Sequence, residues 1–234
     1  SIVISACVCY NHFRKTKVCA FFMITILFQG DSITDANRDD DGVVNFGLGC
    51  GYAYFLACEI EEKNKDKIRF INRGDSGDRI TDVYTRIKED IINLKPDVMS
   101  ILIGVNDVSH ELTMQCGVSP KKFRMIYEML IDEIKECLPE IKIIIMEPFI
   151  LKGTATEKLW TEFNDGVREM AAICEEIAEK YGFDFVPLQE KFDELSMDGN
   201  VSALSVDGIH PTVEGHHIIK EELQKVLAKY IDIF

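Results

Sequence analysis

A serine, an aspartate and a histidine in this sequence have the types and the order needed for nucleophilic chemistry. Ser32 lies in a tight turn directly after an apolar, strand-like stretch, residues 24–28. A serine hydroxyl is a weak nucleophile until a neighbouring base accepts its proton. We expect His210 to be that base, with Asp207, three residues earlier, holding the required ring tautomer. This trio predicts attack of the serine oxygen on a carbonyl carbon.

Attack on a carbonyl group also requires hydrogen-bond donors for the oxyanion that forms. We expect these donors to be the backbone N–H groups of Ser32 and Gly74 and the side-chain amide of Asn106. Each of these residues follows an apolar, strand-like stretch. In open α/β sheets, ligands bind at the carboxyl ends of the strands. The fold is therefore expected to bring the donors and the serine to one edge of a sheet.

Each motif, taken alone, also has an ordinary structural interpretation. The Gly30–Ser32 turn can be only a turn, in which Asp31 braces the backbone. Asn72 and Gly74 suit a loop, Asn106 can cap a helix, and His210 can be an ordinary surface histidine. Their joint occurrence, in order and each after its own strand, favours the catalytic interpretation.

The elements that must position these residues alternate between strands and helices. Residues 98–103 are nearly all apolar, as expected for a strand buried on both faces. Ser119 and Pro120 predict a helix start, because serine caps helices and proline suits their first turn. The alternation predicts an α/β fold with a parallel sheet covered on both faces. The expected strands are residues 24–28, 68–71, 98–103, 141–146 and 183–186, and the expected helices are residues 52–62, 79–93, 120–138, 159–180, 188–195 and 213–230.

The composition bounds the class of protein. The chain has 234 residues, 47% of them hydrophobic, which suits one large domain. Its formal net charge of -14 lacks the basic footprint of a nucleic-acid-binding protein. The longest apolar run, residues 18–28, is shorter than the roughly 20 residues that span a bilayer. The 8 cysteines are scattered without close metal-binding pairs, which favours reduced thiols. We therefore expect a cytoplasmic protein that binds neither nucleic acid nor membrane.

Residues 1–22 fit the rest of the chain poorly. A short apolar piece precedes His12, Arg14, Lys15 and Lys17, whereas a secretory signal places its charges first. Met23 stands where the first strand should begin. We expect residues 1–22 to be an N-terminal extension outside the natural domain, which spans residues 23–234.

Several other residues have weaker claims to a role. Gly47–Gly51 is rich in glycine like a dinucleotide-binding loop, but no strand precedes it, so we expect a loop that lines the mouth of the site. For His216 and His217 in the last helix we expect a packing or supporting role. Tyr52 and Trp160 are candidates for stacking on a sugar ring, although a single tryptophan on a helix is more often part of the core.

The motifs resemble a known family. The four segments listed at the end of this paragraph are similar to the four signature blocks of the SGNH hydrolases, the GDSL esterase/lipase superfamily. The resemblance covers about residues 24–230 and includes Ser32, Gly74, Asn106 and His210. It implies a flavodoxin-like three-layer α/β/α sandwich with a five-stranded parallel sheet, and ester hydrolysis through an acyl-enzyme without a metal or other cofactor. The segments are Gly30–Ile33, Asn72–Gly74, Gly104–Asp107 and Asp207–Pro211.

Finer details resemble bacterial carbohydrate acetyl esterases, a group that includes intracellular acetylxylan esterases. The resembling passages include Leu48–Tyr52, Lys95–Asp97 and His210–His216. The resemblance implies removal of short acyl groups, most plausibly acetyl, from a carbohydrate such as a xylo-oligosaccharide. The alternatives are a lysophospholipase or thioesterase of the same superfamily, a non-catalytic sugar-binding module, and a flavodoxin-like nucleotide binder, which lacks a convincing phosphate loop. The oligomeric state stays open, and a homo-oligomer is one option.

Overall fold

The structure, a computed structural model, describes residues 23–39, 41–43, 45–64, 67–197 and 199–231. The expectation that residues 1–22 lie outside the natural domain concerns residues that are not among those described. No helix within the described ranges is long and apolar enough to cross a membrane.

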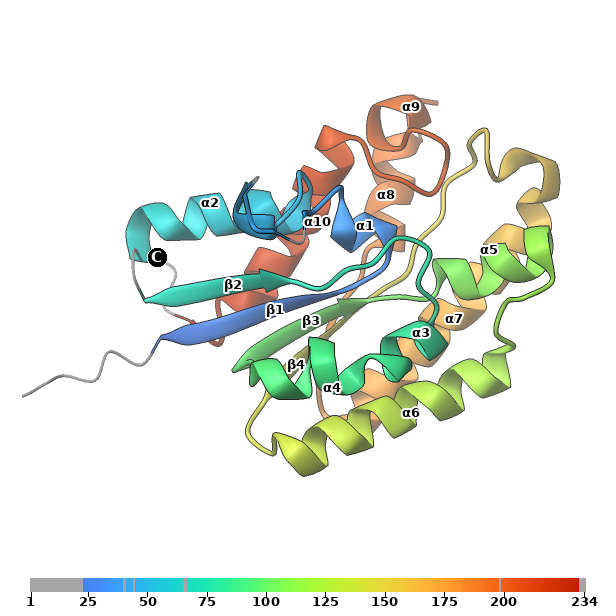
Figure 1. Ribbon diagram of the computed structural model, residues 1–234. Helices are drawn as coiled ribbons and strands as arrows, with labels where there is room; N and C mark the ends of the chain where they lie inside the picture. Colours follow the sequence, from blue (N-terminus) through green and yellow to red (C-terminus); the bar gives the residue numbers. More distant parts are fainter. Residues whose placement is uncertain (1–22, 40, 44, 65–66, 198, 232–234) are drawn as a thin grey trace, which may run out of the picture.

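A five-stranded parallel sheet forms the centre of the protein, with the strand order β2-β1-β3-β4-β5 (Figure 1). The five strands are not equally buried. Strand β3 is buried at every position, as its apolar sequence predicts. The predicted α/β class and five-stranded parallel sheet are confirmed. The strands are β1 (Ile24–Gly30), β2 (Ile68–Asn72), β3 (Val98–Leu102), β4 (Lys142–Met146) and β5 (Asp184–Val186).

Helices cover both faces of the sheet and make the predicted three layers. In Figure 1, α2 (Tyr52–Asn64) and α10 (Val213–Leu227) lie on one face and contact each other. Helices α6 (Pro120–Cys137) and α7 (Trp160–Tyr181) lie on the other face, with α3 (Ile80–Thr85) against α6. The remaining helices are α1 (Ser32–Asp35), α4 (Ile87–Asp90), α5 (Val105–Met114), α8 (Gln189–Ser196), α9 (Val201–Leu204) and the short 3-10 turns η1 (Asn45–Gly47), η2 (Ile92–Leu94) and η3 (Glu157–Leu159).

Helix α6 shows how sequence determines position. Ser119 is its N-cap and Pro120 its first residue, where the missing proline N–H needs no partner. Its apolar side chains recur at helical spacing and are buried against the core, while charged residues occupy the remaining face. The buried residues are Phe123, Tyr127, Leu130, Ile131 and Ile134.

The single helix predicted over residues 79–93 is wrong. The structure divides this stretch into α3, α4 and η2, with the break at Arg86, whose backbone is non-helical (φ -100°, ψ 11°). The Thr85 hydroxyl donates to the Thr81 carbonyl at 2.8 Å. Such bonds from a threonine to the preceding turn commonly bend helices.

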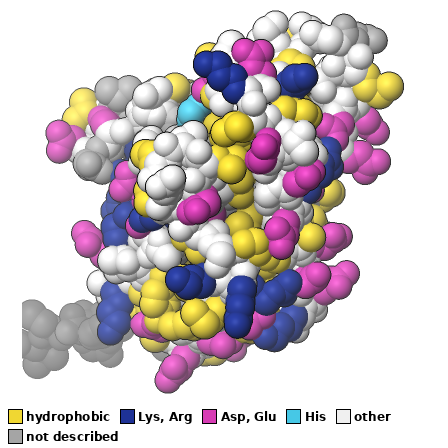
Figure 2. All heavy atoms as spheres, turned by 90° about the vertical axis from the view of Figure 1, so that its right-hand side faces the viewer, with side chains coloured by type: hydrophobic (Ala, Val, Ile, Leu, Met, Phe, Trp, Pro, Cys, Tyr) yellow, Lys and Arg dark blue, Asp and Glu magenta, His cyan; other side chains and the backbone are white. Residues whose placement is uncertain are grey.

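The strand order places the predicted site residues at one edge. Strands β2, β1 and β3 are neighbours, and Gly74, Ser32 and Asn106 follow their respective carboxyl ends. This edge lies on the right of Figure 1 and faces the viewer in Figure 2, where acidic, basic and apolar side chains are interspersed.

Candidate active site

The turn after β1 places Ser32 at the start of α1. A Cβ atom at Gly30 would lie 2.4 Å from the Leu102 carbonyl oxygen, so the close approach of β3 requires glycine. Asp31 is the N-cap of α1, and its carboxylate accepts the Ile33 N–H at 3.0 Å. Burial raises the pKa of Asp31 to about 7. Asp31 therefore braces the turn, as predicted.

The three residues predicted to act together form one hydrogen-bonded chain. Ser32 Oγ lies 3.0 Å from His210 Nε2, and His210 Nδ1 lies 2.8 Å from Asp207 Oδ2. With the proton of His210 on Nδ1, Nε2 is left free to accept the Ser32 proton. The His210 side chain is 48% exposed, so a substrate can reach it from solvent.

Asp207 is fixed by the backbone of its own loop. Its second oxygen, Oδ1, accepts the N–H groups of Ile209 and His210, each at 2.9 Å. Partial burial raises the pKa of Asp207, but the hydrogen bonds from His210 and Ile209 outweigh burial, and the pKa falls below its ordinary value. Asp207 is thus held as a carboxylate against the histidine.

The three predicted oxyanion donors differ in how free they are. Ser32 N–H belongs to the first residue of α1, where an amide has no acceptor within the helix. The Asn106 side chain is buried, and its Nδ2 donates to the Asp78 carbonyl at 3.0 Å, which uses one of its two hydrogens. Gly74 N–H donates to Asn72 Oδ1 at 2.9 Å, so this amide already has an acceptor.

A cavity of about 560 Å³ opens beside Ser32 and His210. Among the described residues that line it, the titratable side chains are those of His210, His216 and Cys50, and none is Lys, Arg, Asp or Glu. The glycine-rich loop contributes Cys50, which agrees with the prediction that this loop lines the mouth of the site. The lining residues are Ser32, Ala36, Asn37, Cys50, Ser76, Val206, His210, Pro211, Thr212, Val213 and His216.

The other predicted candidates have structural roles. His216 Nδ1 accepts the Tyr52 N–H at 3.2 Å, and His217 stacks on Phe55, so both histidines pack as expected. Tyr52 is fully buried, and its hydroxyl bonds Thr34 at 2.9 Å. Stacking of Tyr52 on a sugar is therefore excluded, because the core already covers its ring. Trp160 packs partly against the same core.

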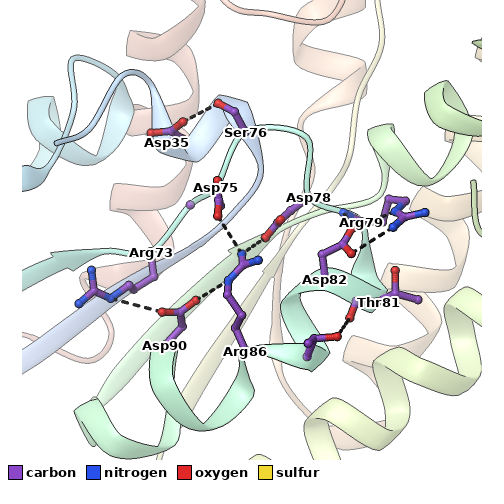
Figure 3. Close-up of polar contacts among 12 residues, drawn as sticks. Asp35, Arg73, Asp75, Ser76, Asp78, Arg79, Thr81, Asp82, Arg86 and Asp90 are labelled. Atoms are coloured by element: carbon purple, nitrogen blue, oxygen red, sulfur yellow. Dashed lines mark hydrogen bonds and ion pairs between the residues drawn. The ribbon is translucent and has the colours of Figure 1, made fainter. Parts of the chain in front are cut away.

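A polar network beside the site was not predicted from the sequence (Figure 3). Ser76 Oγ donates to Asp35 Oδ2 at 2.5 Å, and Arg86 pairs with Asp75 and Asp78. These partners are far from helical spacing, and local spacing indicates only neighbouring pairs such as Arg86 with Asp90 and Arg79 with Asp82. Within the part of the chain that the structure describes, no cluster of His, Cys, Asp and Glu is arranged to hold a metal ion.

The protein has an α/β fold with a hydrogen-bonded serine, histidine and aspartate at the carboxyl ends of its strands, and comparisons with known proteins show its family. Residues 28–218 match the GDSL-like Lipase/Acylhydrolase family. An acetylxylan esterase from Geobacillus stearothermophilus is 33% identical over 199 residues, which cover 83% of this chain and 89% of that protein. The chain therefore belongs to the GDSL-like lipase/acylhydrolase family and is a carboxylic ester hydrolase.

Solved structures show the same likeness. A catalytic mutant of an acetylxylan esterase from Geobacillus stearothermophilus superposes with a TM-score of 0.77 and 30% identity, covering 86% of this chain and 93% of that one. An alpha/beta hydrolase from the metagenome of Lake Arreo superposes with a TM-score of 0.75 and 25% identity, covering 88% and 96% of the two chains. Catalytic mutants of the Geobacillus enzyme replace a serine, an aspartate or a histidine by alanine.

Proposed function

We propose that this protein is a serine esterase that removes short acyl groups, acetyl above all, from a carbohydrate such as a xylo-oligosaccharide. The observation that carries the proposal is the hydrogen-bonded chain from Ser32 through His210 to Asp207, which opens onto an uncharged cavity. The proposed partner is a small ester or an oligosaccharide ester, and the reaction uses no cofactor.

The reaction begins at the Ser32 hydroxyl. His210 Nε2 accepts its proton while Oγ forms a bond to the acyl carbon, and the carbonyl oxygen becomes an oxyanion. Ser32 N–H and the second hydrogen of Asn106 Nδ2 donate to this oxyanion. Gly74 N–H is a third donor that shares its hydrogen with Asn72 Oδ1. Each such donor is typically worth about 2.7–4 kcal/mol in the transition state.

Collapse of this intermediate completes the first stage, acylation, and hydrolysis of the acyl-enzyme is the second stage. The bond to the leaving alcohol breaks, and the alcohol oxygen takes the proton from His210 Nε2, which leaves Ser32 acylated. A water molecule gives a proton to His210 and attacks the acyl-serine in the same geometry. The carboxylic acid leaves as Ser32 Oγ regains its proton, so His210 acts once as base and once as acid in each stage.

The surroundings of the serine support a neutral, hydroxyl-rich leaving group. The Asn37 amide, and the Ser76 hydroxyl as an acceptor, suit sugar hydroxyls, while Val206 and Val213 are exposed apolar side chains at the same opening. A similar protein adds weight, because the Geobacillus enzyme is an acetyl-xylooligosaccharide esterase. The cavity opens to solvent at His210, which suits a short acyl group better than a fatty chain.

Hydrolysis of p-nitrophenyl acetate and of the octanoate ester, by the wild-type protein and by Ser32→Ala, tests the proposal. We expect acetate cleavage that the substitution abolishes, and poor cleavage of octanoate. Release of acetate from acetylated xylo-oligosaccharides, followed by NMR, then tests the carbohydrate. Strong octanoate cleavage would favour the lysophospholipase or thioesterase alternative. Binding of xylo-oligosaccharides without hydrolysis would favour the sugar-binding module.

A further inference from the structure

The loop that joins β2 to α3, residues 73–79, is rich in charged residues, with Arg73, Asp75, Asp78 and Arg79. We call it the β2–α3 loop. It contains Gly74, one of the proposed oxyanion donors, and the carboxylates of Asp75 and Asp78. Figure 3 shows both carboxylates turned toward one guanidinium, that of Arg86, at the break between α3 and α4.

Arg86 bridges three carboxylates. Its Nη2 pairs with Asp78 and lies 3.5 Å from Asp75 Oδ2, while its Nε donates to Asp90 at 2.9 Å. Asp78 is buried, and burial raises its pKa to about 6 despite the opposing charge of Arg86. A buried carboxylate that loses its cation is strongly destabilised, so these contacts fix where the loop lies.

The loop is in turn bonded to the proposed oxyanion hole. The Asp78 carbonyl accepts Asn106 Nδ2 at 3.0 Å, which fixes the rotation of that amide. The Asp75 N–H donates to the Gly30 carbonyl at 3.0 Å, immediately before the serine turn. Gly74 lies so close to α1 that a Cβ atom there would be 2.4 Å from the Asp35 nitrogen. A shift of Asp75 or Asp78 therefore moves the Asn106 amide and the Gly74 backbone together.

We propose that Arg86 is a positioning residue for ester hydrolysis: by bridging Asp75 and Asp78 it holds the β2–α3 loop so that the Asn106 amide faces the oxyanion. This inference rests on the proposed function. Arg86 does not line the cavity at Ser32, so it acts through the loop rather than on substrate. A displacement of about 1 Å in a catalytic constellation can reduce the rate by about 10²-fold.

The test compares p-nitrophenyl acetate kinetics of wild type, Arg86→Gln, Asn106→Ala and the double variant. We expect Arg86→Gln to lower kcat by roughly 10- to 100-fold with KM changed less than about 3-fold, because misplaced donors weaken transition-state stabilisation and not substrate binding. In the Asn106→Ala background, the same substitution should lower kcat by a clearly smaller factor, since the part of its effect that passes through Asn106 is already lost and only the part that passes through Gly74 remains. If the kcat loss of the double variant equals the product of the two single losses, the inference is overturned. An unchanged kcat in Arg86→Gln would also overturn it.

Arg168→Gln is the matched control, because Arg168 also loses an aspartate partner, Asp193 at 2.9 Å, on the exposed side of α7. We expect it to keep the wild-type kcat, and an equal loss there would overturn the inference.

Arg86→Lys keeps the charge but presents one ammonium to three carboxylates, so it should recover part of the kcat. If Arg86→Gln does not fold, Arg86→Lys with and without Asn106→Ala carries the same comparison. Wild-type activity that survives Ser32→Ala would refute the proposed function, whereas a normal kcat in the Arg86 variants would refute the positioning role alone.

Discussion

Asp207 uses its two oxygens for different purposes. One oxygen faces His210 Nδ1 at 2.8 Å, and the other holds the loop through the N–H groups of Ile209 and His210. The tautomer of the histidine and the shape of its loop therefore depend on the same carboxyl group. Replacement of Asp207 by asparagine keeps the shape of the side chain but changes one carboxylate oxygen to nitrogen, so it separates these two purposes.

We expect Asp207→Asn to lower kcat by up to about 10⁴-fold while the protein stays folded. The retained amide oxygen can still accept the two backbone N–H groups, but the new NH₂ forces His210 into the tautomer that cannot take the Ser32 proton. Ester cleavage assays and a thermal melt of the same preparation measure both effects. A rate within a few-fold of wild type would show that Asp207 does not set the tautomer.

Asn106 is the second residue whose role can be isolated. Removal of its amide in Asn106→Ala should lower kcat by about 10²–10³-fold with KM little changed, because the donor acts on the transition state. The lost hydrogen bond leaves the buried Asp78 carbonyl without this donor and should destabilise the fold by about 1–3 kcal/mol.

Asn164→Ala on α7 provides a control for Asn106→Ala, since Asn164 also makes side-chain hydrogen bonds. Its kcat should equal that of wild type. An Asn106→Ala enzyme that retains the wild-type rate would remove Asn106 from the oxyanion hole.

How much of the site the sequence predicts depends on how local each contact is. Ser32 after its strand and the Asp207–His210 spacing are local patterns, so they could be recognised. The bond from Asn106 to the Asp78 carbonyl and the bridge from Arg86 to Asp75 depend on how the β2–α3 loop folds back on its neighbouring helices. No periodicity encodes such contacts, so no role for Asp75 can be predicted from the sequence.

Among the elements, the strands and the long helices were predictable because their apolar residues recur with clear periods. Helix α5 was missed because Val105–Met114 follows β3 after only two residues, and its start depends on Gly104, whose φ of 135° suits glycine. Tyr52 was a candidate for stacking on a sugar because its position at the start of α2 does not reveal its burial. The packing of α10 against α2 and the hydrogen bond to Thr34 are visible only in the structure.

The contact between α10 and α2 contains a titratable group that should affect stability. Burial, with the nearby His217 and His210, lowers the pKa of His216 from 6.5 to about 4. Between pH 6.5 and 4 the unfolded chain therefore binds a proton that the folded protein does not. Stability from this residue is full above pH 6.5 and is lost as the pH falls, by roughly 3 kcal/mol in total.

In His216→Gln, whose side-chain oxygen can still accept the Tyr52 N–H, this dependence should disappear. Urea unfolding at several pH values between 7 and 4.5 should show the stability of the variant approaching that of wild type as the pH falls. Asp31, whose pKa is raised to about 7, contributes a dependence of opposite sign in both proteins and cancels in the difference. A constant difference across the range would contradict the prediction.

At the scale of the whole molecule, charge should influence which esters arrive at the site. The described residues that line the cavity include no Lys, Arg, Asp or Glu, but the chain carries a net charge of -14. A field of this sign repels anionic substrates at long range. Salt shortens the range of that field from about 30 Å at 0.01 M to about 8 Å at 0.15 M.

We therefore expect kcat/KM for anionic 4-acetoxybenzoate to rise severalfold between these ionic strengths, because repulsion weakens. The rate for neutral 4-acetoxybenzamide, which has a similar size, should stay nearly constant. Parallel behaviour of the two esters would show that the acidic surface does not reach the site.

Ser32 and His210 are 178 positions apart, and the second arrives only with the loop before the final helix. A growing chain therefore emerges from the ribosome with its nucleophile long before its base. Pairings between distant segments form slowly, and chains of this size commonly pass through intermediates. Ester cleavage during refolding would then report the moment when Ser32 and His210 meet, whereas circular dichroism would report helices that form earlier. The difference between the two signals would time the last step of maturation.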